Sequence, residues 1–510
     1  MGLDVAKAST AMSEESTKPV YAALVDSHRR LYRFEHLAAI VGWDRHTMMP
    51  PGGHEARAAA EAELQMLIHA QRTDASLNDR LERAQHEPLD ALEQADLREM
   101  RRDWMAAQAV PTGLVEARSL AASRCEHAWR TQRPANDWPG FLENFRPLLA
   151  RVREEAERLA EHTGLSPYDA LLDRFEPGMR SARVDALFGE LKTWLPALIR
   201  TACARQQADP VVLPQGPFPI ERQRALSRAV LELFGFDWGA GRLDESAHPF
   251  TGGVSEDVRI TTRYHSGDCL QAFMATIHEC GHALYSQHLP SAWSGRPVAR
   301  PRSFGIHESQ SLFLELQLAR SPALARMLSP LLMAHLGPQP AFEPENLYRL
   351  LTRVRPGKIR VAADEVTYPA HVILRYEIEK ALIDGSLGAE DIPAAWDEHM
   401  ATLLGVDTRG DHRDGCLQDV HWAKGNFGYF PCYTLGAMYA AQWAAAMRAD
   451  DPGLDARIEA GDLSAVFEWL DTHIWSQASR WETDALAQRA SGDVLDARHL
   501  RVHLERRYLG

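Results

Sequence analysis

Cysteine is scarce in this sequence: six residues are scattered over 510, and no two of them form a CxxC pair. A disulfide framework or a cysteine zinc site needs denser, regularly spaced cysteines, so this composition excludes both. Cys280 stands two residues after His278, an offset that points to the opposite side of a helix. We therefore expect reduced thiols, with Cys280 outside any metal site.

Lysine is also scarce, with six residues among the 56 lysines and arginines, the formal net charge is −14, and no block of basic residues appears. Phosphate binding needs a basic face, so nucleic acid is not expected as a partner. No apolar run reaches the roughly 20 residues of a membrane-spanning helix. The first residues lack the apolar segment of a secretory signal peptide. We expect a cytoplasmic protein that does not bind membranes.

Patterns typical of β-strands are almost absent. From residue 20 to about residue 205, apolar residues recur with the 3.6-residue period of helices, which predicts a bundle of long helices. Residues 258–264 alternate between apolar and polar and predict one short strand. At the edge of a sheet such a strand could pair with an extended peptide, and the alternative is a short structural hairpin.

An HExxH motif occupies residues 278–282 of a predicted amphipathic helix. His278 and His282 are four residues apart, so both imidazoles lie on one helix face and can bind one metal ion. Glu279 lies about 100° round the helix, where it can reach a water on the metal and act as the general base. Asp268 and Gln271 predict a capping box at the start of this helix. The alternative is a helix that carries two histidines without a metal.

A third ligand is expected, because a catalytic zinc usually has three protein ligands and one open position. A second helix is predicted to begin at Phe304, after a loop rich in Pro, Arg and Gly. It carries Glu308, 26 residues after His282, as the best-placed acid. His307 and Glu315 are the competitors, and for Glu315 the alternative is an exposed or paired helix acid. Two His and one Glu suit either Zn²⁺, the expected metal, or Co²⁺.

Four further motifs accompany HExxH, and a segment at residues 40–52 forms a sixth feature. The motifs, in chain order, are DxRxT at 257–261, HECGH at 278–282, HESQ at 307–310, IRxxAD at 359–364 and GxxQDxHW at 415–422. Together they resemble the carboxypeptidase Taq family of metallocarboxypeptidases, which are HExxH peptidases of the gluzincin kind, over nearly the whole chain. The resemblance implies a homodimeric enzyme that acts on peptides.

The same resemblance implies roles for residues that spacing leaves open. It makes Glu308 the third metal ligand and places His421 and Tyr433 near the scissile carbonyl. A Tyr hydroxyl or an imidazolium aimed at the developing oxyanion stabilises it by a few kcal/mol. Tyr429 is the rival of Tyr433, since the two are four residues apart at the start of a helix predicted near Pro431. For either tyrosine the alternative is an ordinary core position.

A carboxypeptidase must also hold the C-terminal carboxylate of its substrate, and a buried carboxylate calls for a bidentate arginine. Arg360, in the IRxxAD motif, is the first candidate. Its alternative role is a salt bridge to Asp364, four residues later on the same helix face. Arg259 and Arg263, in the predicted strand, are the other candidates.

The predicted fold is mainly α: a large helical body with a deep substrate groove and a small β-element beside the zinc helix, similar to helical zinc oligopeptidases. Residues 1–18 are predicted to form a flexible tail and residues 19–510 a single domain. Within it, residues 19–235 would form a helical wall and residues 236–510 the catalytic half. The predicted function is zinc-dependent release of single C-terminal residues. An endo-acting or dipeptide-releasing oligopeptidase and a non-enzymatic scaffold with structural zinc are the alternatives.

Overall fold

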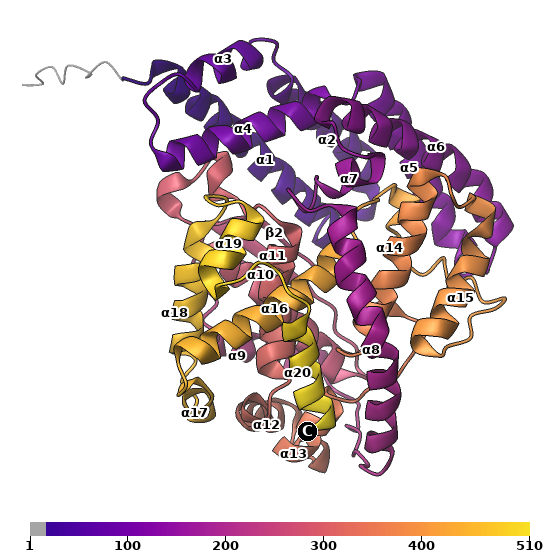
Figure 1. The fold of residues 1–510 in the computed structure, drawn as a ribbon. Coiled ribbons are helices and arrows are strands. Elements are labelled where there is room, and N and C mark those ends of the chain that lie inside the picture. Colours follow the sequence, from indigo (N-terminus) through magenta and orange to yellow (C-terminus); the bar gives the residue numbers. More distant parts are fainter. Residues whose placement is uncertain (1–16) are drawn as a thin grey trace, which may run out of the picture.

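The computed structural model describes residues 17–510, and helices dominate it (Figure 1). The first seven helices gather at one end of the molecule. The predicted tail lies outside the described residues except for Thr17 and Lys18, and the first helix begins at Pro19, a residue favoured at a helix start. These helices are α1 (Pro19–Thr47), α2 (His54–Arg72), α3 (Leu77–Ala84), α4 (Ala91–Gln108), α5 (Thr112–Gln132), α6 (Trp138–Thr163) and α7 (Pro167–Leu172).

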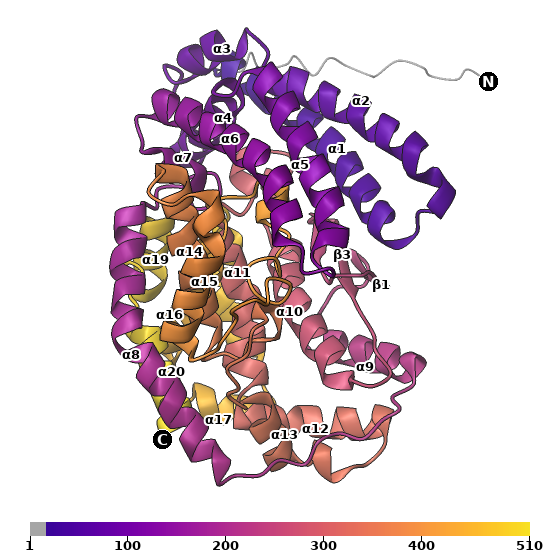
Figure 2. The ribbon, with the colours of Figure 1, turned by 90° about the vertical axis from the view of Figure 1, so that its right-hand side faces the viewer.

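The remaining helices form the larger body below this layer (Figures 1 and 2). α11 packs against both α10 and α16 at its centre, and the other helices surround these three. The helices of the body are α8 (Ser181–Gln207), α9 (Ile220–Leu233), α10 (Cys269–Gln287), α11 (Phe304–Leu312), α12 (Pro322–Leu336), α13 (Pro344–Leu351), α14 (Tyr368–Asp384), α15 (Ile392–Leu404), α16 (Pro431–Asp450), α17 (Leu454–Glu459), α18 (Ser464–His473), α19 (Thr483–Ser491) and α20 (Arg498–Leu509). A π-helical segment, Phe313–Ala319, continues directly from α11.

A small sheet of three strands packs beside α10 in the order β1–β3–β2. β1 (Gly241–Glu245) runs parallel to β3 (Asp257–Thr262), and β2 (Thr251–Val254) runs antiparallel to it. The strand predicted at residues 258–264 is therefore present as β3. It is the central strand, so a place for it at the edge of the sheet was wrong. The free edge on the hairpin side of the sheet belongs to β2. This strand contains two glycines, so its sequence does not show a strand pattern.

Apolar side chains form one large core through the body and a smaller one among the first helices. The smaller cluster joins α1, α3 and α4 through residues such as Leu24, Leu81 and Met100. Among residues 17–510, no helix combines the length and apolar character that crossing a bilayer requires. The division into a helical wall (19–235) and a catalytic half (236–510) stays a prediction.

Candidate metal centre and active site

α10 presents the two histidines of the HExxH motif. Asp268 begins this helix by accepting hydrogen bonds from the backbone N–H groups of Leu270 and Gln271, at 3.0 and 3.1 Å. This is the Asp268 half of the predicted capping box. His278 and His282 then stand one turn apart, with their rings 5.1 Å from centroid to centroid. The local sequence thus places both imidazoles toward α11.

Glu308 of α11 completes a cluster of three donors. Ligand atoms of His278, His282 and Glu308 all lie within 4.8 Å of one another. The Glu308 carboxylate oxygens are 4.0 Å from His278 Nε2 and 3.3 Å from His282 Nε2. Two donors each about 2.1 Å from a tetrahedral zinc lie roughly 3.4 Å apart. The donor set and its spacing therefore fit a divalent metal.

Two glycines make this close approach of helices possible. A Cβ on Gly281, within the HECGH motif, would overlap the carbonyl oxygen of Gln310 and lie 2.5 Å from Ser311 Cα. A Cβ on Gly436 of α16 would lie 2.9 Å from the Cβ of Glu308. Any larger residue would push α10 or α16 away from α11, and with it the Glu308 carboxylate.

The two competitors for the third ligand position lie on the other side of the histidine rings. Glu315 Oε2 is 2.9 Å from His278 Nδ1. His307 Nδ1 is 2.7 Å from His282 Nδ1. Burial lowers the pKa of His307 well below its usual range, and it is neutral. Neither residue belongs to the cluster of three donors. Glu315 pairs with His278, which matches its predicted alternative as a paired helix acid.

Glu279 is buried and held by a residue that sequence reasoning missed. Its Oε2 accepts a hydrogen bond from the hydroxyl of Thr251 at 2.5 Å, and the same hydroxyl lies 3.2 Å from the Glu279 carbonyl oxygen. Thr251 is the first residue of β2. Nothing in the short segment around it signals a role, because the contact depends on where the sheet meets α10.

His421 and Tyr433 contact each other, with 3.2 Å between His421 Nε2 and the Tyr433 hydroxyl oxygen. Burial, reinforced by the nearby Arg360, lowers the pKa of His421 to about 3. This shift favours a neutral ring at physiological pH over an imidazolium. Burial raises the pKa of Tyr433 to about 12, so its hydroxyl keeps its proton.

Tyr429 lies beside Tyr433 but on a different element. α16 begins at Pro431, as predicted, so Tyr433 is in its first turn while Tyr429 precedes it in a loop. The two rings are 5.2 Å apart and almost perpendicular. Tyr429 also packs edge-on against Phe175 and Phe304, which combines a place near the site with the packing of a core tyrosine.

Arg360 forms a buried ion pair with a partner that the sequence did not indicate. Its Nε and Nη2 groups donate to Asp419 Oδ1 at 3.0 and 2.7 Å, and Arg375 donates to Asp419 Oδ2 at 2.6 Å. The two guanidinium groups hold the pKa of Asp419 far below its usual range despite its burial. One carboxylate thus faces two cations, and the group keeps a net positive charge. The Arg360 guanidinium lies 4.8 Å from the Tyr433 ring centre.

The predicted alternative of an Arg360–Asp364 salt bridge is wrong. Residues Arg360–Ala362 form a single 3₁₀ turn, not an α-helix that would bring position 364 onto the same face. Asp364 instead accepts hydrogen bonds from the backbone N–H groups of Val366 and Thr367, both at 3.0 Å, just before α14.

The other two arginine candidates lie on and after β3. Arg259 donates to both oxygens of Asp257 at 2.9 Å and stacks 4.4 Å from the Trp43 ring centre. Trp43 belongs to the N-terminal segment that the sequence analysis singled out, and it packs against the sheet through this contact. Arg263 makes only a long 3.5 Å contact with the Ala247 carbonyl oxygen. Arg259 is thus largely satisfied by its neighbours.

Two buried carboxylates, which no sequence motif indicated, hold the backbone around the site. Glu176 accepts hydrogen bonds from Ser303, at 2.7 Å, and from the N–H of Gly305 at the start of α11. Burial raises the pKa of Glu176 to about 7. Glu379 accepts from the Gly428 N–H at 3.0 Å, just before Tyr429, and burial raises its pKa to about 8.

A groove of about 450 Å³ adjoins the three-donor cluster. α1 lines it with Tyr32, Glu35 and His36, and β2 lines it along its whole length, Thr251–Val254. Thr251 and His307 line its inner end, which connects it to Glu279 and His282. This groove is large enough for several residues of an extended peptide.

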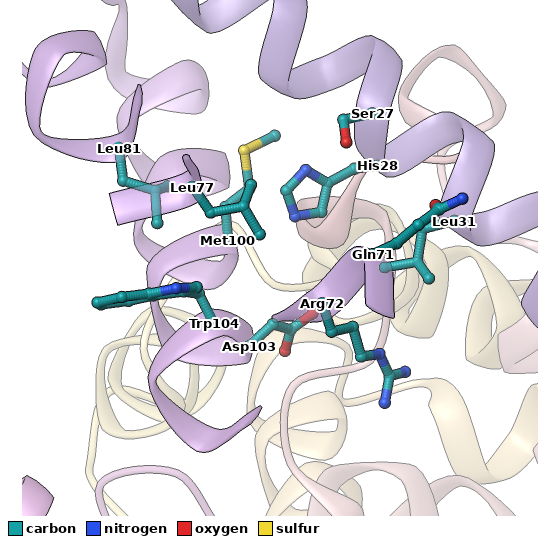
Figure 3. A pocket seen from close by; sticks show the side chains of 10 residues that line it. All are labelled: Ser27, His28, Leu31, Gln71, Arg72, Leu77, Leu81, Met100, Asp103 and Trp104. Atoms are coloured by element: carbon teal, nitrogen blue, oxygen red, sulfur yellow. The ribbon is translucent and has the colours of Figure 1, made fainter. Parts of the chain in front are cut away.

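A second cavity lies away from these residues, among the first helices (Figure 3). His28 of α1 points into it between Met100 and Asp103 of α4, and Trp104 lines it as well. Its volume of about 20 Å³ holds roughly one water. Burial lowers the pKa of His28, whose Nδ1 lies 2.9 Å from the Leu24 carbonyl oxygen. This is a satisfied core histidine beside a packing defect.

Comparison with known proteins gives a consistent result. Residues 23–508 match the family model described as carboxypeptidase Taq (M32) metallopeptidase. The chain is 38% identical over 501 residues to thermostable carboxypeptidase 1 of Thermus thermophilus, covering 96% of this chain and 98% of that protein. It is 34% identical over 496 residues to carboxypeptidase 1 of Bacillus subtilis, covering 95% and 97%.

Solved structures agree with the sequence comparisons. Metallocarboxypeptidase 1 of Trypanosoma cruzi superimposes with a TM-score of 0.95 at 43% identity, covering 97% of this chain and 100% of that one. A carboxypeptidase of Pyrococcus furiosus gives 0.92 at 31% identity, covering 96% and 99%. The mainly helical fold is confirmed, the non-enzymatic scaffold is excluded, and a divalent metal is implied. The chain belongs to the carboxypeptidase Taq (M32) family of metallopeptidases and is a metallocarboxypeptidase that acts on peptides.

Proposed function

We propose that this enzyme is zinc-dependent and releases single amino acids from the C-termini of peptides, with His278, His282 and Glu308 as the metal ligands. The observation that carries the proposal is the cluster of three donors, spaced for one ion, with Glu279 next to the first histidine. A bound zinc supplies Lewis acidity, which lowers the pKa of water and polarises a carbonyl group. Co²⁺ suits the same ligand set.

Glu279 acts as the general base in this proposal. It takes a proton from the attacking water and passes it to the leaving amine. The Thr251 hydroxyl fixes one carboxylate oxygen at 2.5 Å, which leaves the other oxygen for the proton transfer.

Tyr433 donates its hydroxyl proton as a hydrogen bond to the oxyanion that develops on the substrate carbonyl. Two observations favour Tyr433 over Tyr429: its place in the first turn of α16, which packs on α11, and its contact with His421. The neutral His421 orients this hydroxyl by donating its Nε2–H to the Tyr433 oxygen, which leaves the Tyr433 proton for the oxyanion. Tyr429 shapes the wall behind them by packing on Phe304.

Arg360 reads the C-terminal carboxylate of the substrate. The group of Arg360, Arg375 and Asp419 keeps a net positive charge in a buried place, which an anionic group of the substrate neutralises. Arg360 also lies against the Tyr433 ring, next to the proposed reaction centre. Arg259 and Arg263 are the alternatives. Arg259 pairs one to one with Asp257, so that pair carries no net charge to attract the substrate carboxylate.

The remaining peptide runs along the groove between α1 and β2. The free edge of β2 offers backbone groups to an extended chain, as the sequence analysis proposed for β3. A groove walled by α1 on one side excludes folded proteins. A homodimeric state and a cytoplasmic location stay predictions.

Mass spectrometry of a mixed peptide pool tests the proposal directly. We expect ladders shortened one residue at a time from the C-terminus, and none when a chelator is present. C-terminal amides of the same peptides serve as the control and should be cut far more slowly. Internal cleavage, or release of dipeptides, would instead identify an oligopeptidase with the same metal centre.

A further inference from the structure

We propose that Glu315, held by Arg320, is a positioning residue that raises the metal affinity of the centre by fixing and polarising His278. The inference rests on the proposed function only in that His278 is taken as a metal ligand. Neither Glu315 nor Arg320 belongs to a motif that pointed to the site. Glu315 lies in the first turn of the π-helical segment that follows α11, and Arg320 comes directly after that segment.

Contacts of the His278 ring carry the proposal. Its Nε2 faces the three-donor cluster, 4.0 Å from Glu308, whereas its Nδ1 lies 2.9 Å from Glu315 Oε2. The second Glu315 oxygen, Oε1, accepts from Arg320 Nη2 at 2.6 Å. Arg320 is anchored in turn by its Nη1, which donates to the Leu351 carbonyl oxygen at 2.8 Å. The ring is thus connected through two side chains to the backbone of α13.

Such a contact determines the tautomer of the histidine. When Nε2 serves as the ligand, Nδ1 must carry the proton and donate it to Glu315. An ionised carboxylate as the acceptor makes the imidazole a stronger ligand and holds its plane in place. Arg320 pairs with this carboxylate at 2.6 Å, which holds it in place where its side chain is only 17% exposed.

The helix geometry explains how two acids reach opposite sides of one ring. Glu308 and Glu315 are seven residues apart, so in a regular helix they lie on nearly one line about 10 Å apart along the axis. That span is enough to bracket an imidazole. Glu315 stands in the π-helical segment Phe313–Ala319, and π-turns are frequent at functional sites. His282 contacts the neutral His307 instead. Of the two histidines, His278 is therefore the one whose Nδ1 contacts a carboxylate.

The zinc dissociation constant of the full-length enzyme, measured by competition with a chelator, tests the inference. We expect Glu315→Gln to bind zinc roughly 10- to 100-fold more weakly while still reaching one ion per chain at saturation. Glu155→Gln is the matched control. Glu155 is a buried carboxylate that also pairs with arginines, Arg118 and Arg174, but it does not touch a histidine of the centre. The Glu155→Gln variant should bind zinc with the affinity of the wild type.

Glu308→Gln, measured in the same series, separates this inference from the proposed function. Loss of affinity in Glu308→Gln with wild-type affinity in Glu315→Gln overturns the positioning role and leaves the metal centre intact. Unchanged affinity in Glu308→Gln overturns the ligand assignment itself.

If Glu315→Gln does not fold, Glu315→Asp keeps the charge but shortens the reach by one methylene. It should also bind zinc more weakly than the wild type, because its carboxylate cannot contact both His278 and Arg320. Wild-type affinity in Glu315→Asp would overturn the inference. The absorption spectrum of the Co²⁺-loaded variants provides a second readout, which should differ between Glu315→Gln and the Glu155→Gln control.

Discussion

Glu279 carries the proton transfers of the proposed reaction, and its replacement by glutamine tests that role most directly. Glutamine has almost the same size but cannot accept the proton. We expect Glu279→Gln to lose at least about 100-fold in kcat, the lower end of general-base contributions. Elemental analysis should still find about one metal ion per chain, because Glu279 is not among the three clustered donors. Near-normal turnover in the metal-loaded variant would contradict the mechanism.

Arg360 is tested by comparing two kinds of substrate. With Arg360→Met we expect kcat/KM on free-acid peptides to fall by roughly 30-fold, from the loss of about 2 kcal/mol of charge-assisted hydrogen bonding. The corresponding amides, which lack the anionic group, should be affected much less.

Arg375→Met is the matched control for this comparison, because Arg375 pairs with the same Asp419 but is fully buried behind it. This variant should lose stability and affect acids and amides alike. Equal losses on both substrates in Arg360→Met would mean that Arg360 only braces Asp419. Arg259 and Arg263 would then become the candidates again.

The neutral His421 gives a prediction for stability in acid. The folded state keeps His421 unprotonated down to a pKa of about 3, whereas an unperturbed histidine takes up a proton near 6.5. Between these values the unfolded chain binds more protons, so stability falls as the pH falls, by up to about 1.4 kcal/mol per pH unit for this one group. In His421→Gln the free energy of unfolding should therefore fall less steeply between pH 6.5 and 4.5.

Denaturant titrations of wild type and His421→Gln at several pH values, with chelator present in both, measure this difference. Chelator keeps the pH dependence of metal binding out of the comparison. Parallel curves would show that His421 is protonated in the folded state, and an imidazolium at the site would have to be reconsidered.

Prediction from sequence succeeded for residues whose relations are local. His278, Glu279 and His282 share one helical turn, so their geometry follows from the helix period alone. Contacts between distant segments had no such signal: Thr251 with Glu279, Arg375 with Asp419 and Arg320 with Glu315 are visible only in three dimensions. Arg360 was singled out as the residue that holds the substrate carboxylate, and this stays a prediction. Its predicted salt bridge to Asp364 was wrong, because a helix was assumed where the chain makes one 3₁₀ turn.

At the scale of elements, the packing of α10 on α11 depends on a residue without a side chain. We expect Gly281→Ala to cost about 1–3 kcal/mol of stability through overpacking and to weaken metal binding, because the added Cβ meets the backbone of Gln310 and Ser311. Gly189→Ala on α8 is the control. Its Cβ would have no neighbour within 4 Å, and removal of a helical glycine should stabilise by about 0.5–1 kcal/mol. Similar behaviour of the two variants would contradict the tight-packing explanation.

Elements were predictable where their pattern is long and regular. The helices of the first 205 residues, the helix of the HExxH motif and the start of α16 at Pro431 follow from period, caps and proline. β1 and β2 were missed, because five and four residues rich in glycine and charge show no alternation. Without them, β3 could not be placed in the centre of the sheet.

At the scale of the molecule, the groove joins the N-terminal helices to the reaction centre. α1 contacts the β2–β3 hairpin through His36 and Asp257, at 3.2 Å, and through Tyr32 and Glu256, at 3.3 Å. The sequence could indicate two halves of the chain. It could not indicate that this hairpin brings the two halves into contact. In the proposed binding mode, a peptide in the groove would lie between α1, which would shape its side-chain pockets, and the edge of β2, which would bind its backbone.

If the peptide pairs with β2 as an added strand, blocking its backbone N–H groups should lower kcat/KM at several positions in a regular pattern, not at one position alone. Backbone groups of an edge strand point outward at every second residue, so only alternate residues of the peptide exchange hydrogen bonds with it. A series of peptides, each N-methylated at one position on the N-terminal side of the scissile bond, should show losses at alternate positions. Each loss should be about 1 kcal/mol, or roughly fivefold in kcat/KM, and should end beyond about four residues, the length of β2. Losses that decline smoothly with distance from the scissile bond would instead indicate that side-chain pockets of α1, and not the strand edge, hold the peptide.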